Sequence, residues 1–124
     1  MKRLLQRRRF LALLFAAALM SSVPSLCVAA EKPKPATIFI HARQFAFVPE
    51  EITVHVGQPV RLVFISDDVP HAISVEGLPI DLPITKKPTS VVITPEKIAE
   101  LTGKCSRYCG SGHHDMRLTI HVIE

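Results

Sequence analysis

Four side chains that can bind a soft metal ion lie within twelve residues near the C-terminus. They are Cys105, Cys109, His113 and Met116, in the pattern Cys-x3-Cys-x3-His-x2-Met. Thiolate, thioether and imidazole donors favour copper, zinc or iron–sulfur clusters over magnesium or calcium. Glycines between the second cysteine and the histidine let the backbone fold back, so that the four side chains can converge as they could not along an extended strand. The sequence therefore predicts a metal-binding loop between two strands.

A further candidate ligand, His71, lies 34 residues before the first of these cysteines. It follows the turn sequence Asp68-Val69-Pro70, at the end of an apolar run that we expect to form a strand. The loops at one end of a β-sandwich gather in space, so His71 can meet the C-terminal loop there. Asp67 and Asp68 either orient this loop and hydrogen-bond His71, or are ordinary turn formers.

Apolar and polar residues alternate along most of the chain after residue 35, as in strands with one face on a core and the other in water. The clearest run is the last, where Leu118, Ile120 and Val122 alternate with polar residues. Similar runs lie at 38–40, 52–56, 60–65, 73–75 and 91–93, and turn residues separate them at 57–59, 67–70, 77–83 and 86–88. We therefore predict an all-β protein, an antiparallel β-sandwich of about six to eight short strands.

One segment of the chain is predicted to be helical. In Pro95–Leu101 the proline suits the first turn of a helix, and Ile98 and Leu101 are three residues apart. The expected fold thus contains one short helix beside its strands.

The first thirty residues are predicted to be an export signal. A cationic stretch precedes an apolar run at 10–20, and Val28-Ala29-Ala30 supplies the small residues that signal peptidase accepts. We expect cleavage after Ala30, and the alternative is an uncleaved membrane anchor. Residues 31–36 are then a charged, proline-rich linker, and residues 37–124 the folded domain. In either case the domain lies in the periplasm or on the extracytoplasmic face of the membrane.

The net charge of +4 comes from this leader, which holds five of the fifteen Lys and Arg residues and none of the eleven acidic residues. The rest of the chain has ten basic and eleven acidic side chains, a net charge of −1. A nucleic-acid-binding protein needs a basic face on its folded part. We therefore expect no nucleic acid among the partners.

From about Phe45 to Val122 the sequence resembles the cupredoxin domain of cytochrome c oxidase subunit II and of nitrous oxide reductase. The matching motifs are Phe47-Val48-Pro49, Asp68-Val69-Pro70-His71 and the Cys-x3-Cys-Gly-x2-His-x2-Met loop. The resemblance implies a cupredoxin-like Greek-key β-sandwich that holds a dinuclear copper-A centre. It assigns the ligands as follows: bridging thiolates from Cys105 and Cys109, one imidazole for each copper from His71 and His113, and weak axial ligands from Met116 and the backbone carbonyl of Arg107.

The resemblance implies an electron-transfer domain rather than an enzyme. The expected donor is an exported cytochrome or small copper protein, the expected acceptor is a terminal oxidase or reductase, and a copper-delivery protein would load the site. The ligand set has no obvious open position, which argues against substrate chemistry because catalytic metals keep a position free. Arg107 replaces a family glutamate that helps bind magnesium, so we expect no magnesium role. With at most one apolar segment before it, the domain is expected to be free-standing or singly anchored.

Other interpretations of the same residues are open. The two cysteines of an exported protein can form a disulfide, and with His71 and His113 they can form a tetrahedral zinc site. The same ligands can serve a periplasmic copper metallochaperone that holds a single cuprous ion. A thiol–disulfide reductase is a weaker alternative, because the thioredoxin-like βαβ pattern is absent from the sequence.

The remaining histidines and the tyrosine receive simpler assignments. His114 is expected to be a solvated neighbour of the ligand loop, and Tyr108 either covers the site or only packs. His41, His55 and His121 fall on the polar side of the predicted strands, so they are expected to be surface residues.

Overall fold

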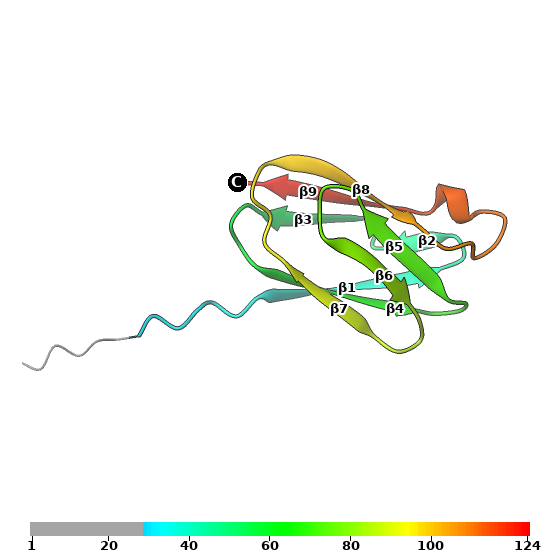
Figure 1. The fold of residues 1–124 in the computed structure, drawn as a ribbon, viewed down its shortest axis with the longest axis horizontal. Helices are drawn as coiled ribbons and strands as arrows, with labels where there is room; N and C mark the ends of the chain where they lie inside the picture. The colour runs from blue at the N-terminus through cyan, green and yellow to red at the C-terminus, as the bar shows by residue number, and fades with distance from the viewer. Residues whose placement is uncertain (1–28) are drawn as a thin grey trace, which may run out of the picture. The chain divides into compact units, whose positions relative to one another are not determined.

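The computed structural model describes residues 29–124, so the predicted signal sequence lies outside the described residues except for its last two positions. The strands within this range are β1 Ala36–Arg43, β2 Ala46–Val48, β3 Glu51–His55, β4 Val60–Ser66, β5 His71–Val75, β6 Ile80–Ile84, β7 Thr89–Ile93, β8 Ala99–Cys105 and β9 Arg117–Ile123 (Figure 1). A short 3-10 turn, η1 His113–Asp115, precedes β9. The described part of the chain contains no helix with the length and apolar character of a membrane span.

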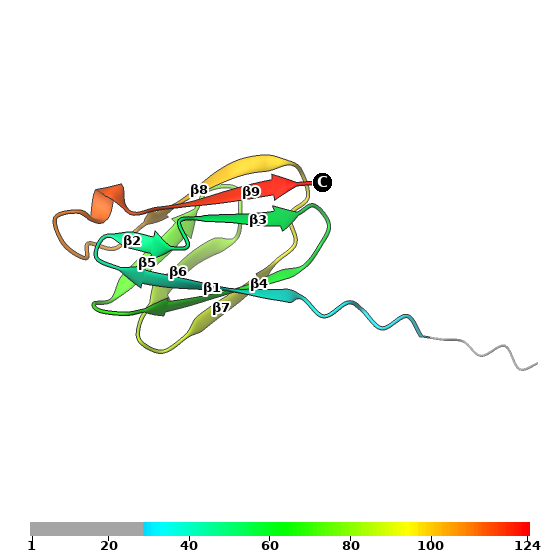
Figure 2. The same ribbon diagram turned by 180° about the vertical axis from the view of Figure 1, so that it is seen from behind.

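The strands form two sheets packed as a sandwich (Figures 1 and 2). The four-stranded sheet has the order β2-β1-β4-β7, and the five-stranded sheet has the order β3-β9-β8-β5-β6. The prediction of an all-β sandwich is confirmed. The expectation of purely antiparallel pairing is wrong for two pairs, because β1 runs parallel to β4 and β3 runs parallel to β9. The chain enters the other sheet at β3 and returns at β4, which brings β4 beside β1 in the same direction.

A single apolar core fills the space between the sheets. In β9, Leu118, Ile120 and Val122 are buried as their alternation predicts, and they share one cluster with Leu62 and Phe64 of β4. Because both sheets contribute to this cluster, the strand ends that carry the candidate ligands are fixed to one rigid body.

We expect Phe64→Ala to lower the free energy of unfolding by about 3–5 kcal/mol, because the side chain is 0% exposed and its loss leaves a cavity. Val92→Ala in β7 is the matched control, since Val92 is 44% exposed and its truncation should change stability by only about 0.5 kcal/mol. Urea unfolding of the copper-free protein measures both values. Equal losses in the two variants would contradict the assignment of Phe64 to the core.

The predicted helix at Pro95–Leu101 is wrong. Residues 95–98 are irregular, and β8 begins at Ala99. β8 is hydrogen-bonded to β5 on one side and to β9 on the other, and this tertiary pairing outweighs the weak local helical pattern. The short helical element of the described residues is instead η1, in the ligand loop.

Strand β6 lies where the turn residues at 77–83 predicted a loop. Ile80 and Ile84 are buried in the core and anchor it, and Pro83 lies near its end. Proline cannot donate a backbone hydrogen bond, but β6 is an edge strand of its sheet, where that loss is tolerated.

Candidate metal centre

Three loops meet at one end of the sandwich (Figures 1 and 2). They are the tip of the β1–β2 hairpin at 44–45, the β4–β5 turn at 67–70, and the loop 106–116 between β8 and β9. We call this last segment the ligand loop. The first two loops are joined by a hydrogen bond from the Gln44 backbone N–H to Asp68 Oδ2 (2.7 Å), and the first and third by one from Gln44 Nε2 to the Cys109 carbonyl (2.6 Å). The chain thus brings segments distant in sequence to one place, as predicted for His71.

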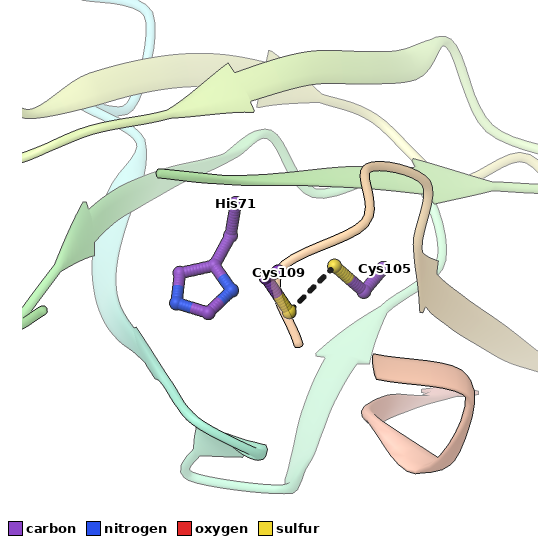
Figure 3. A group of neighbouring side chains, drawn as sticks. All are labelled: His71, Cys105 and Cys109. Atoms are coloured by element: carbon purple, nitrogen blue, oxygen red, sulfur yellow. Dashed lines mark hydrogen bonds between the residues drawn. The ribbon is translucent and has the colours of Figure 1, made fainter. Parts of the chain in front are cut away.

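His71, Cys105 and Cys109 form a compact group of potential ligands (Figure 3). Their ligand atoms all lie within 4.8 Å of one another, and all three residues are buried. The two sulfur atoms are 3.7 Å apart and both thiols are free, so the cysteines do not form a disulfide in this structure. Two buried thiols and a buried imidazole are a donor set that suits copper or zinc.

Met116 and Arg107 add a thioether and a carbonyl beside this group. Met116 Sδ lies 3.4 Å from Cys109 Sγ, and the Met116 side chain is 0% exposed. Cys105 Sγ donates a hydrogen bond to the Arg107 carbonyl at 3.1 Å. Each of these atoms therefore lies beside one of the two cysteine sulfurs, and the Arg107 carbonyl does so independently of the Arg107 side chain.

His71 is fully buried and oriented by one carboxylate. Its Nε2 donates a hydrogen bond to Asp68 Oδ1 at 2.8 Å, which leaves Nδ1 as a bare acceptor. That Nδ1 is buried and has no hydrogen-bond partner. A buried polar atom without a partner is costly, and a metal ion is the partner that would satisfy this one.

His113 shows the same feature in a different setting. It is not one of the three residues whose ligand atoms lie within 4.8 Å of one another. Its Nδ1 is nevertheless buried without a hydrogen-bond partner, like that of His71. Within the described residues these are the two buried side-chain nitrogen or oxygen atoms without a partner, and both belong to predicted copper ligands. His113 therefore keeps one nitrogen free of hydrogen bonds, but the compact group of donors contains His71 and not His113.

Asp68 is held in its charged form. Burial alone would raise the pKa of this carboxyl, but hydrogen bonds from the Gln44 backbone, the His71 side chain and the Val69 backbone outweigh it, and the pKa lies below its ordinary value. Asp68 is therefore an ionised acceptor that fixes the orientation of the His71 ring. Of the two interpretations of Asp68, the one in which it hydrogen-bonds His71 is confirmed.

Sequence reasoning missed the role of the Gln44-Phe45 tip. A Cβ added at Gly112 would lie 2.6 Å from Cγ of Phe45, and one added at Gly110 would lie 2.7 Å from its Cε1. The ligand loop thus packs its backbone directly on the Phe45 ring. The paired glycines were the available signal for a close approach, but they gave no indication of which residue lies against them.

Comparison with curated proteins identifies the family of the chain. It is 32% identical over 102 residues to the cytochrome c oxidase subunit 2 of Thermus thermophilus, a match that covers 82% of this chain and 76% of that protein. The chain belongs to the cytochrome c oxidase subunit II family. A second subunit 2 from the same species matches with the same identity, and there the match spans 61% of the relative's length. No protein-family model matches the chain.

Solved structures place the subunit II-family chain in the cupredoxin fold. The periplasmic domain of subunit II (CoxB) of Bradyrhizobium japonicum superposes with a TM-score of 0.68 at 21% identity, over 74% of this chain and 87% of that domain. A chain from a heme-copper terminal oxidase dimer gives a TM-score of 0.64 at 24% identity, over 86% and 83%. The blue copper protein auracyanin A of Chloroflexus aurantiacus gives 0.58 at 16%, over 72% and 99%. The cupredoxin-like fold expected from the sequence is therefore confirmed.

Copper binding by this subunit II-family protein should strengthen with rising pH. Burial, followed by the hydrogen bond and charge of Cys105, raises the pKa of Cys109 to about 11. The thiol is therefore protonated in the metal-free protein near neutral pH, and metal binding must displace that proton. Between about pH 7.5 and 9 we expect the apparent Cu(I) affinity to rise at least about tenfold per pH unit. Competition with a chelator of known pH dependence measures it, and a flat profile would contradict thiolate ligation by Cys109.

Proposed function

We propose that this domain is an exported electron carrier whose ligand loop and His71 hold a dinuclear copper centre. Cys105 and Cys109 would supply the bridging thiolates, His71 and His113 the imidazoles, and Met116 and the Arg107 carbonyl the weak axial ligands. When bound, such a centre accepts one electron and returns it. The observation that carries the proposal is the pair of free thiols 3.7 Å apart, together with two buried imidazole nitrogens that lack partners.

The chain contributes a dry and stiff setting for this exchange. Cys105 and Cys109 are 7% and 8% exposed, and His71 and Met116 are fully buried, so water has little access to the donors. His71 begins β5, Cys105 ends β8 and Met116 immediately precedes β9, so the packed sheets hold three of the ligands in place. Rigid positioning keeps the rearrangement that accompanies each electron small. A buried thioether beside the thiols also favours copper over zinc, whose usual ligands are Cys, His and carboxylates.

The proposal includes partners and a location. The relatives of this chain are subunits of cytochrome c oxidase. The domain would therefore receive electrons from an exported cytochrome or small copper protein and pass them to a terminal oxidase or reductase. A copper-delivery protein would load the site. Residues 1–30 would direct export, residues 31–36 would form a linker, and residues 37–124 would lie in the periplasm or at the extracytoplasmic membrane face.

Copper reconstitution of the reduced protein tests the proposal. We expect a purple species with two coppers per chain and a seven-line electron paramagnetic resonance pattern, because two equivalent copper nuclei share one unpaired electron. A four-line spectrum with one copper per chain would reject the dinuclear centre. Reconstitution with zinc under the same conditions is the colourless control.

A copper metallochaperone is the second candidate function, and one observation favours it. His71, Cys105 and Cys109 alone form a group of three donors within 4.8 Å, and such a group is sufficient for a single cuprous ion. In that case the loaded protein should be silent in electron paramagnetic resonance, hold one copper, and transfer it rapidly to a metal-free acceptor. A reversible one-electron couple with two bound coppers would exclude this alternative.

A further inference from the structure

Two basic side chains lie opposite each other on the outer face of the five-stranded sheet. Lys104 of β8 and Arg117 of β9 are paired residues of the antiparallel ladder, and both are exposed. In the described part of the chain neither of them takes part in an ion pair, because the ion pairs found there all join a histidine to a carboxylate. Like charges directly opposite on neighbouring strands destabilise a sheet. The fold therefore keeps an uncompensated positive pair at this place.

This pair lies beside the proposed metal site. Lys104 immediately precedes Cys105, and Arg117 immediately follows Met116. Successive side chains of a strand point to opposite faces, so Cys105 is buried against the core while Lys104 faces solvent. The ligand loop connects the two strands that carry the pair (Figure 1). Positive charge thus lies beside both ends of the ligand loop.

The two basic side chains line an open groove on this outer face. Ser74, Cys105 and Ser106 line the same part of the groove. Because Cys105 is only 7% exposed and its side chain faces the core, the backbone of β8 separates its sulfur from the groove. A molecule seated there would therefore lie one strand away from a proposed copper ligand, without opening the site to water.

Two acidic residues, Glu76 and Glu100, line the part of the groove that lies further from the metal site. Glu100 is four residues before Lys104 in β8, and its carboxylate lies 3.4 Å from Nδ1 of His121. Glu76 follows the last residue of β5, at the end of that strand away from His71. The groove is therefore charged unevenly, with its positive end next to the ligand loop.

The charge of the chain is divided in the same way. Residues 104–117, which include the exposed Arg107, carry three basic side chains and one acidic side chain, a net charge of +2. The rest of residues 31–124 carries seven basic and ten acidic side chains, a net charge of −3. Such a separation of charge attracts a partner of opposite charge to one face and orients it during the encounter.

We propose that Lys104, Arg117 and the groove between them, here called the positive patch, dock an acidic electron-donor protein. Carboxylates of the donor would relieve the repulsion within the patch and hold the donor's redox group against the outer side of β8, next to Cys105. One electron would pass from the reduced donor to the oxidised copper centre. This inference deepens the proposed function and rests on it, but binding of anions at the patch is a property of the metal-free protein.

The metal-free protein tests the patch. The paramagnetic trianion hexacyanochromate(III) broadens the NMR signals of the residues beside which it lies. At low ionic strength we expect the strongest broadening at the amides of Ser74, Lys104 and Arg117, and its loss in Lys104→Gln/Arg117→Gln. This patch variant should be at least as stable as the wild type, because it removes a pair of opposed like charges.

Arg61→Gln/Lys97→Gln is the matched control variant. It also removes two exposed positive charges, one near the start of β4 and one just before β8, at the end of the sandwich away from the ligand loop. The control variant should keep the broadening at the patch. Broadening that is centred elsewhere in the wild type, or that persists in the patch variant, would overturn the proposal whether or not the protein binds copper.

The copper-loaded protein tests whether the patch serves electron transfer. Oxidation of the reduced centre by hexacyanoferrate(III) follows the same route in reverse, since one electron leaves the centre and hexacyanoferrate(II) forms. At low ionic strength we expect the rate constant to be about tenfold lower in the patch variant than in the control variant, the lower end of electrostatic steering effects. The two variants have the same net charge, so the difference reports the position of the charges, and salt should remove it.

An acidic polymer extends this test to macromolecules. Poly-L-glutamate should slow the oxidation of the wild type by occupying the patch, and poly-L-lysine should not. Equal rate constants in the two double variants, or no effect of poly-L-glutamate on the wild type, would overturn the docking role. Failure of the wild type to bind copper would instead overturn the proposed function, and the NMR result on the metal-free protein would still decide whether the patch binds anions.

Discussion

Cys105→Ser should abolish copper binding by this domain. Cys105 Sγ lies 3.7 Å from Cys109 Sγ and 3.1 Å from the Arg107 carbonyl, so it contacts two of the other proposed donors. A serine hydroxyl is a hard donor that stays protonated at neutral pH and cannot replace a thiolate. Removing only a hydrogen-bond partner of a metal ligand lowers metal affinity by up to about 100-fold. Removing the ligand itself should therefore lower the copper affinity by more than about 100-fold. Copper content and the visible spectrum measure the loss.

Two further variants make this result interpretable. Ser106→Ala changes the adjacent exposed residue and should keep the full copper content. Cys105→Ala removes the sulfur without burying a hydroxyl, so it separates ligand loss from any folding defect of the serine variant. Thermal unfolding of the metal-free proteins provides the check on folding. Two coppers per chain and an unchanged spectrum in folded Cys105→Ala would exclude Cys105 as a ligand.

The position of the candidate metal site was predictable because its proposed donors are chemically distinctive and close in sequence. Cys105, Cys109 and Met116 share one short stretch, and their spacing alone predicted that they converge. The position of His71 was predictable because it follows a turn at the end of a strand, and such turns gather at one end of a β-sandwich. The outer contacts were harder to predict, since nothing in the local sequence of Gln44 indicates that it bonds to both Asp68 and Cys109.

The fold was predictable where side chains alternate and unpredictable where pairing overrides them. β9 followed its alternation, with each apolar residue from Leu118 to Val122 buried. β8 also alternates between more buried and exposed residues from Ala99 to Cys105. Its first residues fit a short helical pattern as well, and pairing with β5 and β9 decides in favour of the strand. The proline-containing β6 became a strand through its buried isoleucines and its place at the sheet edge. Pairing partners are a property of the whole chain, so a local pattern cannot reveal them.

Gly112→Ala should reduce copper affinity by about 10- to 100-fold, the loss expected when a residue that positions a metal ligand is changed. The backbone of Gly112 has φ −96°, which alanine accepts, so the penalty is purely steric. The new Cβ would lie 2.6 Å from Cγ and 2.7 Å from Cδ2 of Phe45, far inside van der Waals contact. Either the ring or the ligand loop must move, and His113 follows directly in that loop. Overpacking of this kind costs about 1–3 kcal/mol of stability.

A second substitution at Phe45 separates steric crowding from backbone strain. Phe45→Ala removes the ring that the new methyl group meets, so the double variant Phe45→Ala/Gly112→Ala should regain most of the copper affinity of Phe45→Ala alone. Gly110→Ala is the matched comparison, because its φ of +140° is unfavourable for any L side chain and its Cβ would also approach the Phe45 ring. Removing the ring relieves only the contact there, so Phe45→Ala should rescue Gly112→Ala and leave Gly110→Ala impaired. Strictly additive losses of copper affinity in Gly112→Ala and Phe45→Ala would show that the Phe45 ring does not shape the ligand loop. Recovery of copper affinity in the Gly112 double variant, but not in the Gly110 one, would establish that the loop packs on the Phe45 ring.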